Sequence, residues 1–189
     1  MVSQMVSMKT KLLTFIFYVI SLSSCYAARM DGPYEGRVID AETGRPIEGV
    51  VVLGTWHSIT VTPGGGVSNY YDAQETVTDK NGEFKVKGLG LLVLNNIPEP
   101  DIKVFKTGYE HSGLFWTPGE VPLYSKIKWE GNKVIIPLKK LTMEERKKNL
   151  PPLPPGEAPH KKIKLMLDEY NKNSKELGLG IIDVWRDMK

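Results

Sequence analysis

The chain is poor in cysteine and has no apolar run long enough to span a membrane. Cys25 is the only cysteine among 189 residues, so no intramolecular disulfide can form. The apolar run of residues 12–22 is too short to cross a bilayer as a stable helix. A chain of this length with 41% hydrophobic residues buries one core and leaves no room for a large catalytic domain beside it.

Familiar catalytic motifs are also missing. The three histidines, His57, His111 and His160, lie in separate segments, and none has a glutamate at the spacing of a zinc-binding pair. There is no nucleophile elbow, phosphate-binding glycine loop or cysteine centre. A basic stripe with interleaved aromatic residues is absent, which argues against nucleic acid as a partner. We therefore expect a protein that is not an enzyme and needs no cofactor.

The first residues have the features of a targeting segment. Two lysines precede the apolar run of residues 12–22, as in a signal peptide. Residues 22–25 read Leu-Ser-Ser-Cys and resemble the bacterial lipobox, in which the leader is cut before the cysteine and that residue receives acyl chains such as palmitate. Several acyl chains anchor a protein stably, since each buried methylene contributes about 0.8 kcal/mol. We expect residues 1–24 to be a signal peptide and Cys25 to be lipidated.

Two locations follow from two ways of cutting the leader. In lipoproteins, a residue such as Tyr26 after the acylated cysteine favours the outer membrane, so the resemblance implies a chain anchored there and facing the periplasm. The alternative is an ordinary secretory leader cut after Ala27 or Ala28. That alternative would give a soluble periplasmic or secreted protein.

Residues 34–53 read as strand, tight turn and strand. Asp40 can bond its side chain to backbone amides two or three residues on, Gly44 can adopt positive φ, and Pro46 fixes φ at the entry to the next strand. We expect a β-hairpin here, with an almost continuous apolar run in its second strand.

Residues 75–87 predict a second hairpin, because Asp, Asn and Gly at its centre favour a turn. A calcium site at Asp79, Asn81 and Glu83 is the alternative to a plain turn. It is disfavoured because the run lacks the carboxylate ladder and distal glutamate of a calcium loop.

These segments resemble the carboxypeptidase regulatory-like domain over roughly residues 34–138. The motif residues are Gly36, Val38, Asp40, Thr43, Gly44, Pro46, Ile47, Gly49, Val50 and Val52, followed by Thr78, Asp79, Gly82 and Phe84, and then by Lys106, Gly108 and Tyr109. The resemblance implies a mainly β fold, a seven-stranded antiparallel prealbumin-like β-sandwich, acting as an accessory module without chemistry of its own. We place a tether at residues 25–33, the sandwich at 34–140, and a Pro-rich spacer with a C-terminal helix at 141–189.

One family of similar fold class is disfavoured. The transthyretin-like hydrolases of purine breakdown end in Tyr-Arg-Gly-Ser, whereas this chain ends in Trp-Arg-Asp-Met-Lys. The prediction of a non-catalytic module stands.

Aromatic residues in two predicted loops suggest a ligand surface. Residues 54–73 read as a long irregular connection around a triple glycine, and residues 110–120 read as a second loop. The predicted surface consists of Trp56, His57, Tyr70, Tyr71 and Trp116. Such a surface suits a carbohydrate, a peptide or another envelope protein. The alternative is that Trp56 and one tyrosine pack over the edge of the core.

A composed metal site is the basis of a competing enzyme hypothesis. His57 and His111 could converge with Glu75 or Asp72 at one end of the sandwich. Two imidazoles and a carboxylate would bind zinc or iron, giving a small metal-dependent enzyme. Lone histidines in loops are more often solvent-facing or capping groups.

The residues beyond 138 change in character. Thr142 and Glu145 have the spacing of a capping box, which predicts a short helix ending near Asn149. Residues 151–155, rich in proline, predict an extended spacer, with a polyproline-binding partner as the alternative.

A second tail helix is predicted by helical spacing of apolar residues, with Gly178 at its C-terminal cap. The apolar positions are Ile163, Met166, Leu167, Tyr170 and Leu177. We expect this helix to dock on the protein's own sandwich. The alternatives are docking to a larger envelope assembly and lying on a membrane surface.

Overall fold

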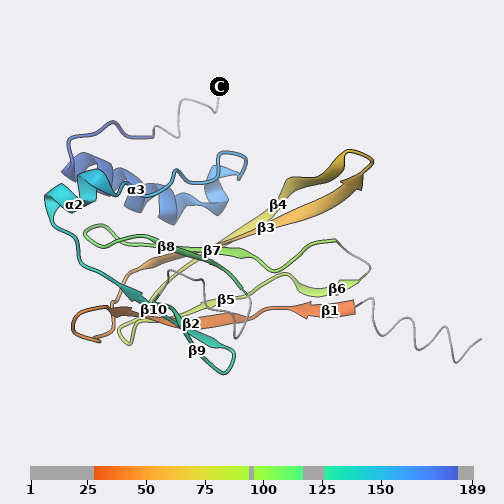
Figure 1. Cartoon of the computed structure of the whole chain (residues 1–189), viewed down its shortest axis with the longest axis horizontal. Coiled ribbons are helices and arrows are strands. Elements are labelled where there is room, and N and C mark those ends of the chain that lie inside the picture. The colour runs from red at the N-terminus through yellow and green to blue at the C-terminus, as the bar shows by residue number, and fades with distance from the viewer. Residues whose placement is uncertain (1–27, 94–95, 117–125, 183–189) are drawn as a thin grey trace, which may run out of the picture. The chain divides into compact units, whose positions relative to one another are not determined.

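The computed structural model describes residues 28–93, 96–116 and 126–182 (Figure 1). The predicted leader and Cys25 lie outside these residues, and the alternative cleavage after Ala27 or Ala28 falls at their first residue. The chain divides into a small unit, Met1–Asp31 with Leu89–Asn95, and a larger unit, Gly32–Gly88 with Asn96–Lys189.

The described part of the small unit is a two-stranded ribbon. Strand β1 (Ala28–Asp31) pairs antiparallel with β6 (Gly90–Val93). The Asp31 carboxylate accepts a hydrogen bond from the Leu89 amide at 2.8 Å, which closes the end of the ribbon. Residues 28–31, predicted as part of a tether, are therefore a strand.

Within its described residues, the larger unit contains two four-stranded sheets. The first has the order β5 (Glu83–Val86), β2 (Tyr34–Asp40), β10 (Lys133–Leu138) and β9 (Lys128–Glu130). The second has the order β4 (Gly65–Val77), β3 (Val51–Thr62), β7 (Asp101–Phe105) and β8 (Ser112–Phe115). The mainly β prediction is confirmed. The predicted seven antiparallel strands differ from this arrangement, because β10 and β2 pair in parallel.

Strand β3 is covered on both faces. Every residue from Val51 to Trp56 is buried, and side chains on a strand alternate between the two faces. Trp56 contacts Tyr34 of the first sheet, with ring centroids 6.0 Å apart, whereas Val51 and Leu53 pack on the other face against the tail. A strand buried on both faces carries a continuous apolar run, which explains the sequence of β3.

The two predicted hairpins are connections between the sheets. Strands β2 and β3 lie in different sheets, and the connection between them pairs with β2 through a bridge between Ile39 and Pro46. Strands β4 and β5 are likewise divided between the two sheets. The turn chemistry was predicted correctly, since Asp40 Oδ1 accepts from the amides of Glu42 and Thr43. The strand pairing was wrong, because a turn sets the local reversal but leaves the long-range partner open.

The predicted irregular connection at residues 54–73 is instead the longest hairpin of the described chain. Strands β3 and β4 pair from Val51 opposite Val77 to Thr62 opposite Gly65, with a bulge beside Trp56. The β-branched residues between Ile59 and Thr62 favour extended backbone and outweigh the neighbouring glycines. The prediction of a loop at residues 110–120 is also wrong in part, because Ser112–Phe115 form strand β8.

Both predicted tail helices are present. Helix α2 (Met143–Lys148) begins with the complete Thr142/Glu145 capping box and ends at Asn149. Helix α3 (Lys164–Glu176) follows a 3-10 turn, η1 (His160–Lys162), and ends before Gly178, whose φ is 71°. Within the described ranges, no helix is long and apolar enough to cross a membrane.

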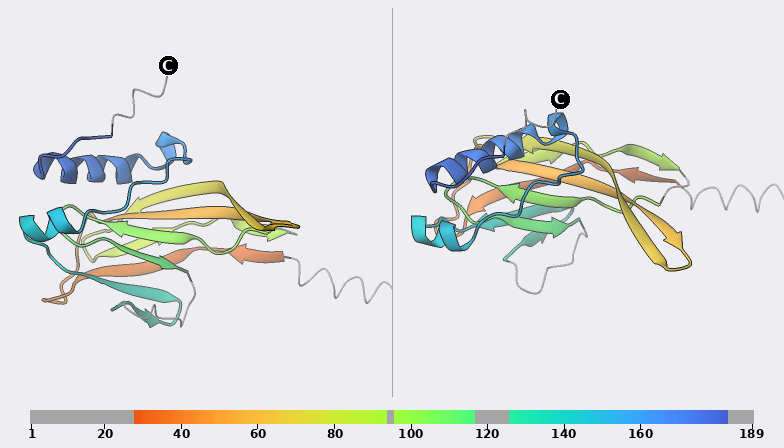
Figure 2. Two further views of the ribbon diagram at one scale, coloured as in Figure 1. Left: turned by 45° about the horizontal axis from the view of Figure 1, so that its top comes forward. Right: turned by 90° about the horizontal axis from the view of Figure 1, so that it is seen from above.

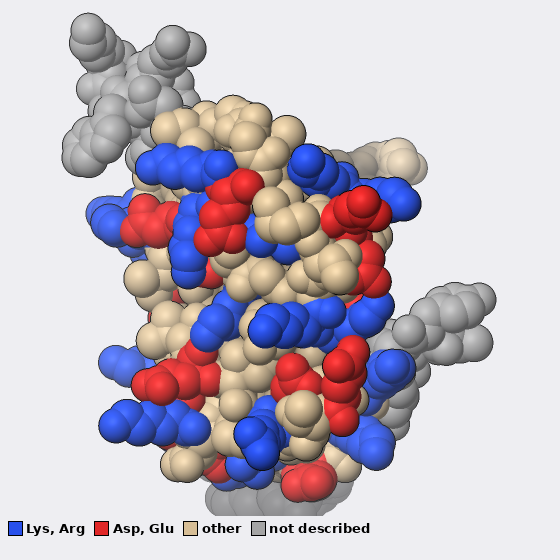
Figure 3. All heavy atoms as spheres, turned by 90° about the vertical axis from the view of Figure 1, so that its left-hand side faces the viewer, with Lys and Arg blue, Asp and Glu red and all other residues tan. Residues whose placement is uncertain are grey.

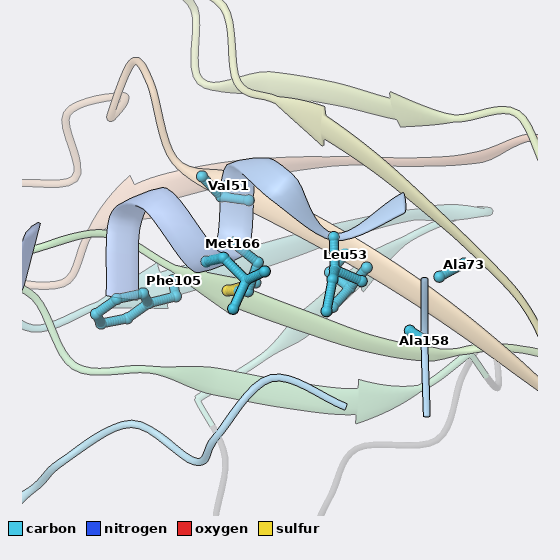
Figure 4. Packing of buried hydrophobic residues seen from close by; sticks show 8 residues of the cluster. Val51, Leu53, Ala73, Phe105, Ala158 and Met166 are labelled. Atoms are coloured by element: carbon cyan, nitrogen blue, oxygen red, sulfur yellow. The ribbon is translucent and has the colours of Figure 1, made fainter. Parts of the chain in front are cut away.

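Helix α3 docks on the outer face of the second sheet, as Figures 2 and 4 show. The buried cluster at this contact comprises Val51, Leu53, Ala73, Phe105, Ala158, Ile163, Met166 and Leu167. Arg146 of α2 also donates to Asn173 of α3 at 2.6 Å. The predicted docking on the protein's own sheet is confirmed. The tail belongs to the same unit as the sheets and is not a separate appendage.

Two valines on β3 make a matched pair for testing this core. Val52 is 0% exposed and Val61 is 86% exposed. We expect Val52→Ala to lower the free energy of unfolding by about 2 kcal/mol, because it removes two buried methyl groups and leaves a cavity. We expect Val61→Ala to change it by less than about 0.5 kcal/mol. Urea denaturation measures both, and equal losses would contradict the assigned faces.

Candidate binding surface

The two tryptophans predicted for a ligand surface lie in the core. Trp56 is 0% exposed and Trp116 is 5% exposed. Tyr34 packs against both, with its ring centroid 6.0 Å from Trp56 and 5.0 Å from Trp116. Trp129 extends the group by an edge-on contact with Trp116 at 5.0 Å. Large rings fill the space between the sheets, so these tryptophans contribute nothing to an exposed surface.

The other three predicted surface residues lie near the bulge of the β3–β4 ribbon. The His57 and Tyr70 rings meet edge-on with centroids 6.5 Å apart, and His57 Nε2 lies 3.7 Å from a Glu157 carboxylate oxygen. Burial raises the pKa of Tyr70. Tyr71 is the extra residue of the bulge and is 52% exposed. The predicted five-residue aromatic surface is therefore not formed, and only Tyr71 offers a well-exposed ring.

His111 lies apart from His57. It lines a cavity of about 100 Å³ with Tyr170 and residues 151–154. Burial lowers the pKa of His111, which favours its neutral form. The same cavity shows that the Pro-rich stretch lies against the protein's own body, with Pro151 buried, so it is not the free spacer that the sequence predicted.

The carboxylates predicted for a metal site have other partners. Asp72 Oδ1 pairs with Lys162 Nζ at 2.6 Å, and Glu75 accepts hydrogen bonds from two tail amides. Among the described residues, no group of three or more His, Cys, Asp or Glu side chains is placed to hold a metal ion. The composed site of His57, His111 and a carboxylate is therefore not assembled.

The turn before β5 is a plain turn. Asp79 Oδ1 accepts from the amides of Asn81 at 2.8 Å and Glu83 at 2.9 Å, and Gly82 has a φ of 72°. The side-chain oxygen that a calcium ion would use thus holds the turn closed. The sequence prediction of a plain turn is confirmed.

Glu75 joins the second sheet to helix α3. Its two carboxylate oxygens accept from the Leu165 amide at 2.9 Å and the Met166 amide at 2.7 Å. These amides belong to the first turn of α3, whose own N-cap residue makes no side-chain bond. Burial raises the pKa of Glu75, and the two amide bonds oppose that shift. A carboxylate on β4 therefore caps a helix about ninety residues away in the chain.

The outer half of the β3–β4 ribbon is the most distinctive exposed feature of the larger unit. We call residues 58–71 the arm. Strand β7 pairs with β3 only from Val51 to Thr55, so the arm extends past the rest of the sheet, as Figures 1 and 2 show. On the inner side, Asn96 O accepts from the Ile59 amide at 3.0 Å.

The arm contains no Asp, Glu, Lys or Arg, although a quarter of the chain is charged. Ile59, Val61 and Val67 are exposed on it. Strand β4 is the edge of its sheet and pairs only with β3 among the described strands. Exposed edge strands are normally protected by charged side chains or proline, and the outer edge of the arm has neither. The signal for this surface was present in the sequence, as a charge-free interval between Glu48 and Asp72.

No protein-family model, curated protein or solved structure matches this chain.

The Glu75 cap can be tested with a matched glutamate on β5. We expect Glu75→Ala to lower the free energy of unfolding by about 1 kcal/mol, because it removes the cap of α3. It should also speed amide hydrogen exchange at Leu165 and Met166. Glu83→Ala, at an exposed position, should change the free energy by less than about 0.5 kcal/mol. Unchanged exchange at both amides would contradict the capping role.

Proposed function

We propose that this chain is a non-catalytic protein-binding module of the cell envelope. In this proposal it is a carboxypeptidase regulatory-like domain protein, anchored by lipid on Cys25, with the periplasm as its working compartment. Its binding element is the outer edge of β4 along the arm, and its partner is an extended segment of another envelope protein. The observation that carries the proposal is the exposed, charge-free edge of the arm.

An unpaired edge strand is a template for strand addition. The backbone groups of alternate residues on β4 face away from β3, and an added strand would satisfy them through main-chain hydrogen bonds. The absence of charge removes the usual obstacle to such pairing. The exposed Val67 and Tyr71 side chains would pack beside those of the added strand.

The placement of ionisable groups favours a binding role over catalysis. Asp72 and Glu75 each hold part of the tail in place, through Lys162 and the first turn of α3 respectively, and His57 Nε2 lies 3.7 Å from a Glu157 carboxylate oxygen. Groups held in structural bonds are poorly placed to transfer protons to a substrate.

Other partners have less support. A carbohydrate surface needs exposed aromatic rings, and the two tryptophans are buried. Docking of α3 to a larger assembly would need a free apolar stripe, and the stripe of α3 is buried against the second sheet. An extended protein segment on the arm is therefore the partner that the geometry favours.

Photocrosslinking in cells that express the full chain tests this partner. A photoreactive residue at Ser68 should give one discrete adduct with another protein. Adding Val67→Lys and Asn69→Lys should abolish the adduct, because charges on an edge strand disfavour pairing. A photoreactive residue at Lys128 on β9 is the control for position and should give no such adduct.

Three outcomes would overturn the proposed partner. They are the absence of an adduct at Ser68, an adduct that survives the two lysines, and an adduct formed equally from Lys128. An adduct of twice the chain's mass would instead assign the edge to self-association.

The anchor has its own test. We expect Cys25→Ala to move the chain from the membrane fraction to the soluble fraction, because the lipid attachment point is lost. Ser23→Ala leaves that point intact and should keep the chain in the membrane fraction. Mass spectrometry of the wild-type protein should show acyl chains on Cys25. A mature N-terminus at Ala28 or Arg29 without lipid would contradict the anchor.

A further inference from the structure

A second feature of the β4 edge lies below the arm. Residues 73–76 of β4 line an open groove of about 610 Å³, together with residues 85–87 at the end of β5 and Lys161, Lys162, Lys164 and Leu165 of the tail. The four β4 residues span about 13 Å at the usual rise of a strand. The groove is therefore about as long as a four-residue extended peptide.

Lysines dominate the walls of this groove. Five of them line it, Lys85, Lys87, Lys161, Lys162 and Lys164, and the only acidic residue among the lining residues is Glu75. The charge of Glu75 is compensated by its bonds to the first turn of α3. The ionisable side chains that line the groove are therefore mainly basic.

Two of these lysines have no acidic partner among the described residues. Lys85 pairs with Glu35, Lys162 with Asp72, and Lys164 with Asp168. Lys87 and Lys161 are exposed and form no ion pair with any residue that the structure describes. On the face seen in Figure 3, by contrast, basic and acidic side chains are interspersed. That face is therefore mixed in charge, whereas the lining of the groove is mainly basic.

The lysines approach the β4 edge from both sides of its sheet. Strand β5 belongs to the first sheet, and Gln74 of β4 donates to the Gly88 carbonyl oxygen beyond the end of β5 at 2.9 Å. The tail lies on the outer face of the second sheet. A strand added at this edge would turn alternate side chains to opposite faces, and each face would meet lysines.

We propose that the groove binds an acidic peptide segment in extended form, added as a strand beside residues 73–76. Carboxylates on one face of the segment pair with Lys87, and those on the other face pair with Lys161. Because both faces are basic, the groove selects consecutive acidic residues and not an alternating pattern. The inference deepens the proposed function by giving the chemistry of the partner, and it uses a part of the β4 edge that the arm does not include.

The test is an NMR titration of the mature chain with three hexapeptides, in the Cys25→Ala variant, which lacks the lipid attachment point and is expected to be soluble. Each has threonine at both ends and four identical residues between them, which are glutamate, glutamine or lysine. We expect the glutamate peptide to shift the amide signals of residues 73–76 and 161–165. Its affinity should fall as ionic strength rises. The glutamine and lysine peptides should not shift these signals at the same concentration.

Charge-removing variants identify the lysines. Lys87→Gln and Lys161→Gln should each weaken binding of the glutamate peptide about threefold, and together about tenfold, as expected for two exposed ion pairs. The control is Lys126→Gln with Lys128→Gln, which removes the same charge beside β9, outside the groove lining. This control pair should leave the affinity unchanged.

Several outcomes would overturn the proposed peptide site or its mode of binding. Equal binding of the three peptides, no binding of the glutamate peptide, or an equal loss in the control pair would overturn the acidic-peptide site. Shifts confined to residues other than 73–76 would overturn strand addition. Failure here leaves the Ser68 adduct unaffected, and loss of that adduct leaves the titration unaffected, so the two proposals fail separately.

Discussion

The larger unit depends on the contact between its C-terminal tail and the outer face of the second sheet. Leu53 and Phe105 would be exposed on that face without the tail, and Met166 and Leu167 of α3 would have no apolar surface to cover. The contact is held at the start of α3 by polar bonds, from Glu75 to the first turn of the helix and from Lys162 to Asp72. The same contact places the tail lysines beside the β4 edge. Packing, capping and the proposed recognition chemistry therefore come from one interaction.

Local features of the fold were predictable from the sequence, and long-range features were not. The Thr142 capping box, the Asp40 turn and the stripe of α3 each depend on residues within a few positions of one another, and each was found. The parallel pairing of β2 with β10 joins residues about a hundred positions apart, and no local sequence pattern indicates this pairing. A family resemblance based on short local motifs was therefore able to predict a mainly β fold without giving the strand pairing.

The candidate site shows the same limit. Trp56 was assigned to a ligand surface at the end of a strand, with packing against the core as the alternative. Its spacing from Val52 along one strand places it on the inward face, where it is buried, as the alternative expected. The bulge beside Trp56 then changes the alternation, so residues beyond it could not be assigned to a face from sequence.

The two halves of β4 also differ in their content of charged residues, in a way that fits their surroundings. Charged residues occur where the tail covers the strand, at Asp72 and Glu75, and are absent along the arm.

The position of β10 has a consequence for the way the protein is made. This strand is the last of the ten in the described chain, yet it lies inside the first sheet, between β2 and β9. Until the ribosome has released residue 138, β2 has only β5 beside it, and the buried side of the sheet stays open. The first sheet of a nascent chain therefore cannot form completely until late in synthesis. Its strand pairing has a high contact order, since β2 and β10 are far apart in the sequence. Such a chain stays incompletely folded while it is being synthesised.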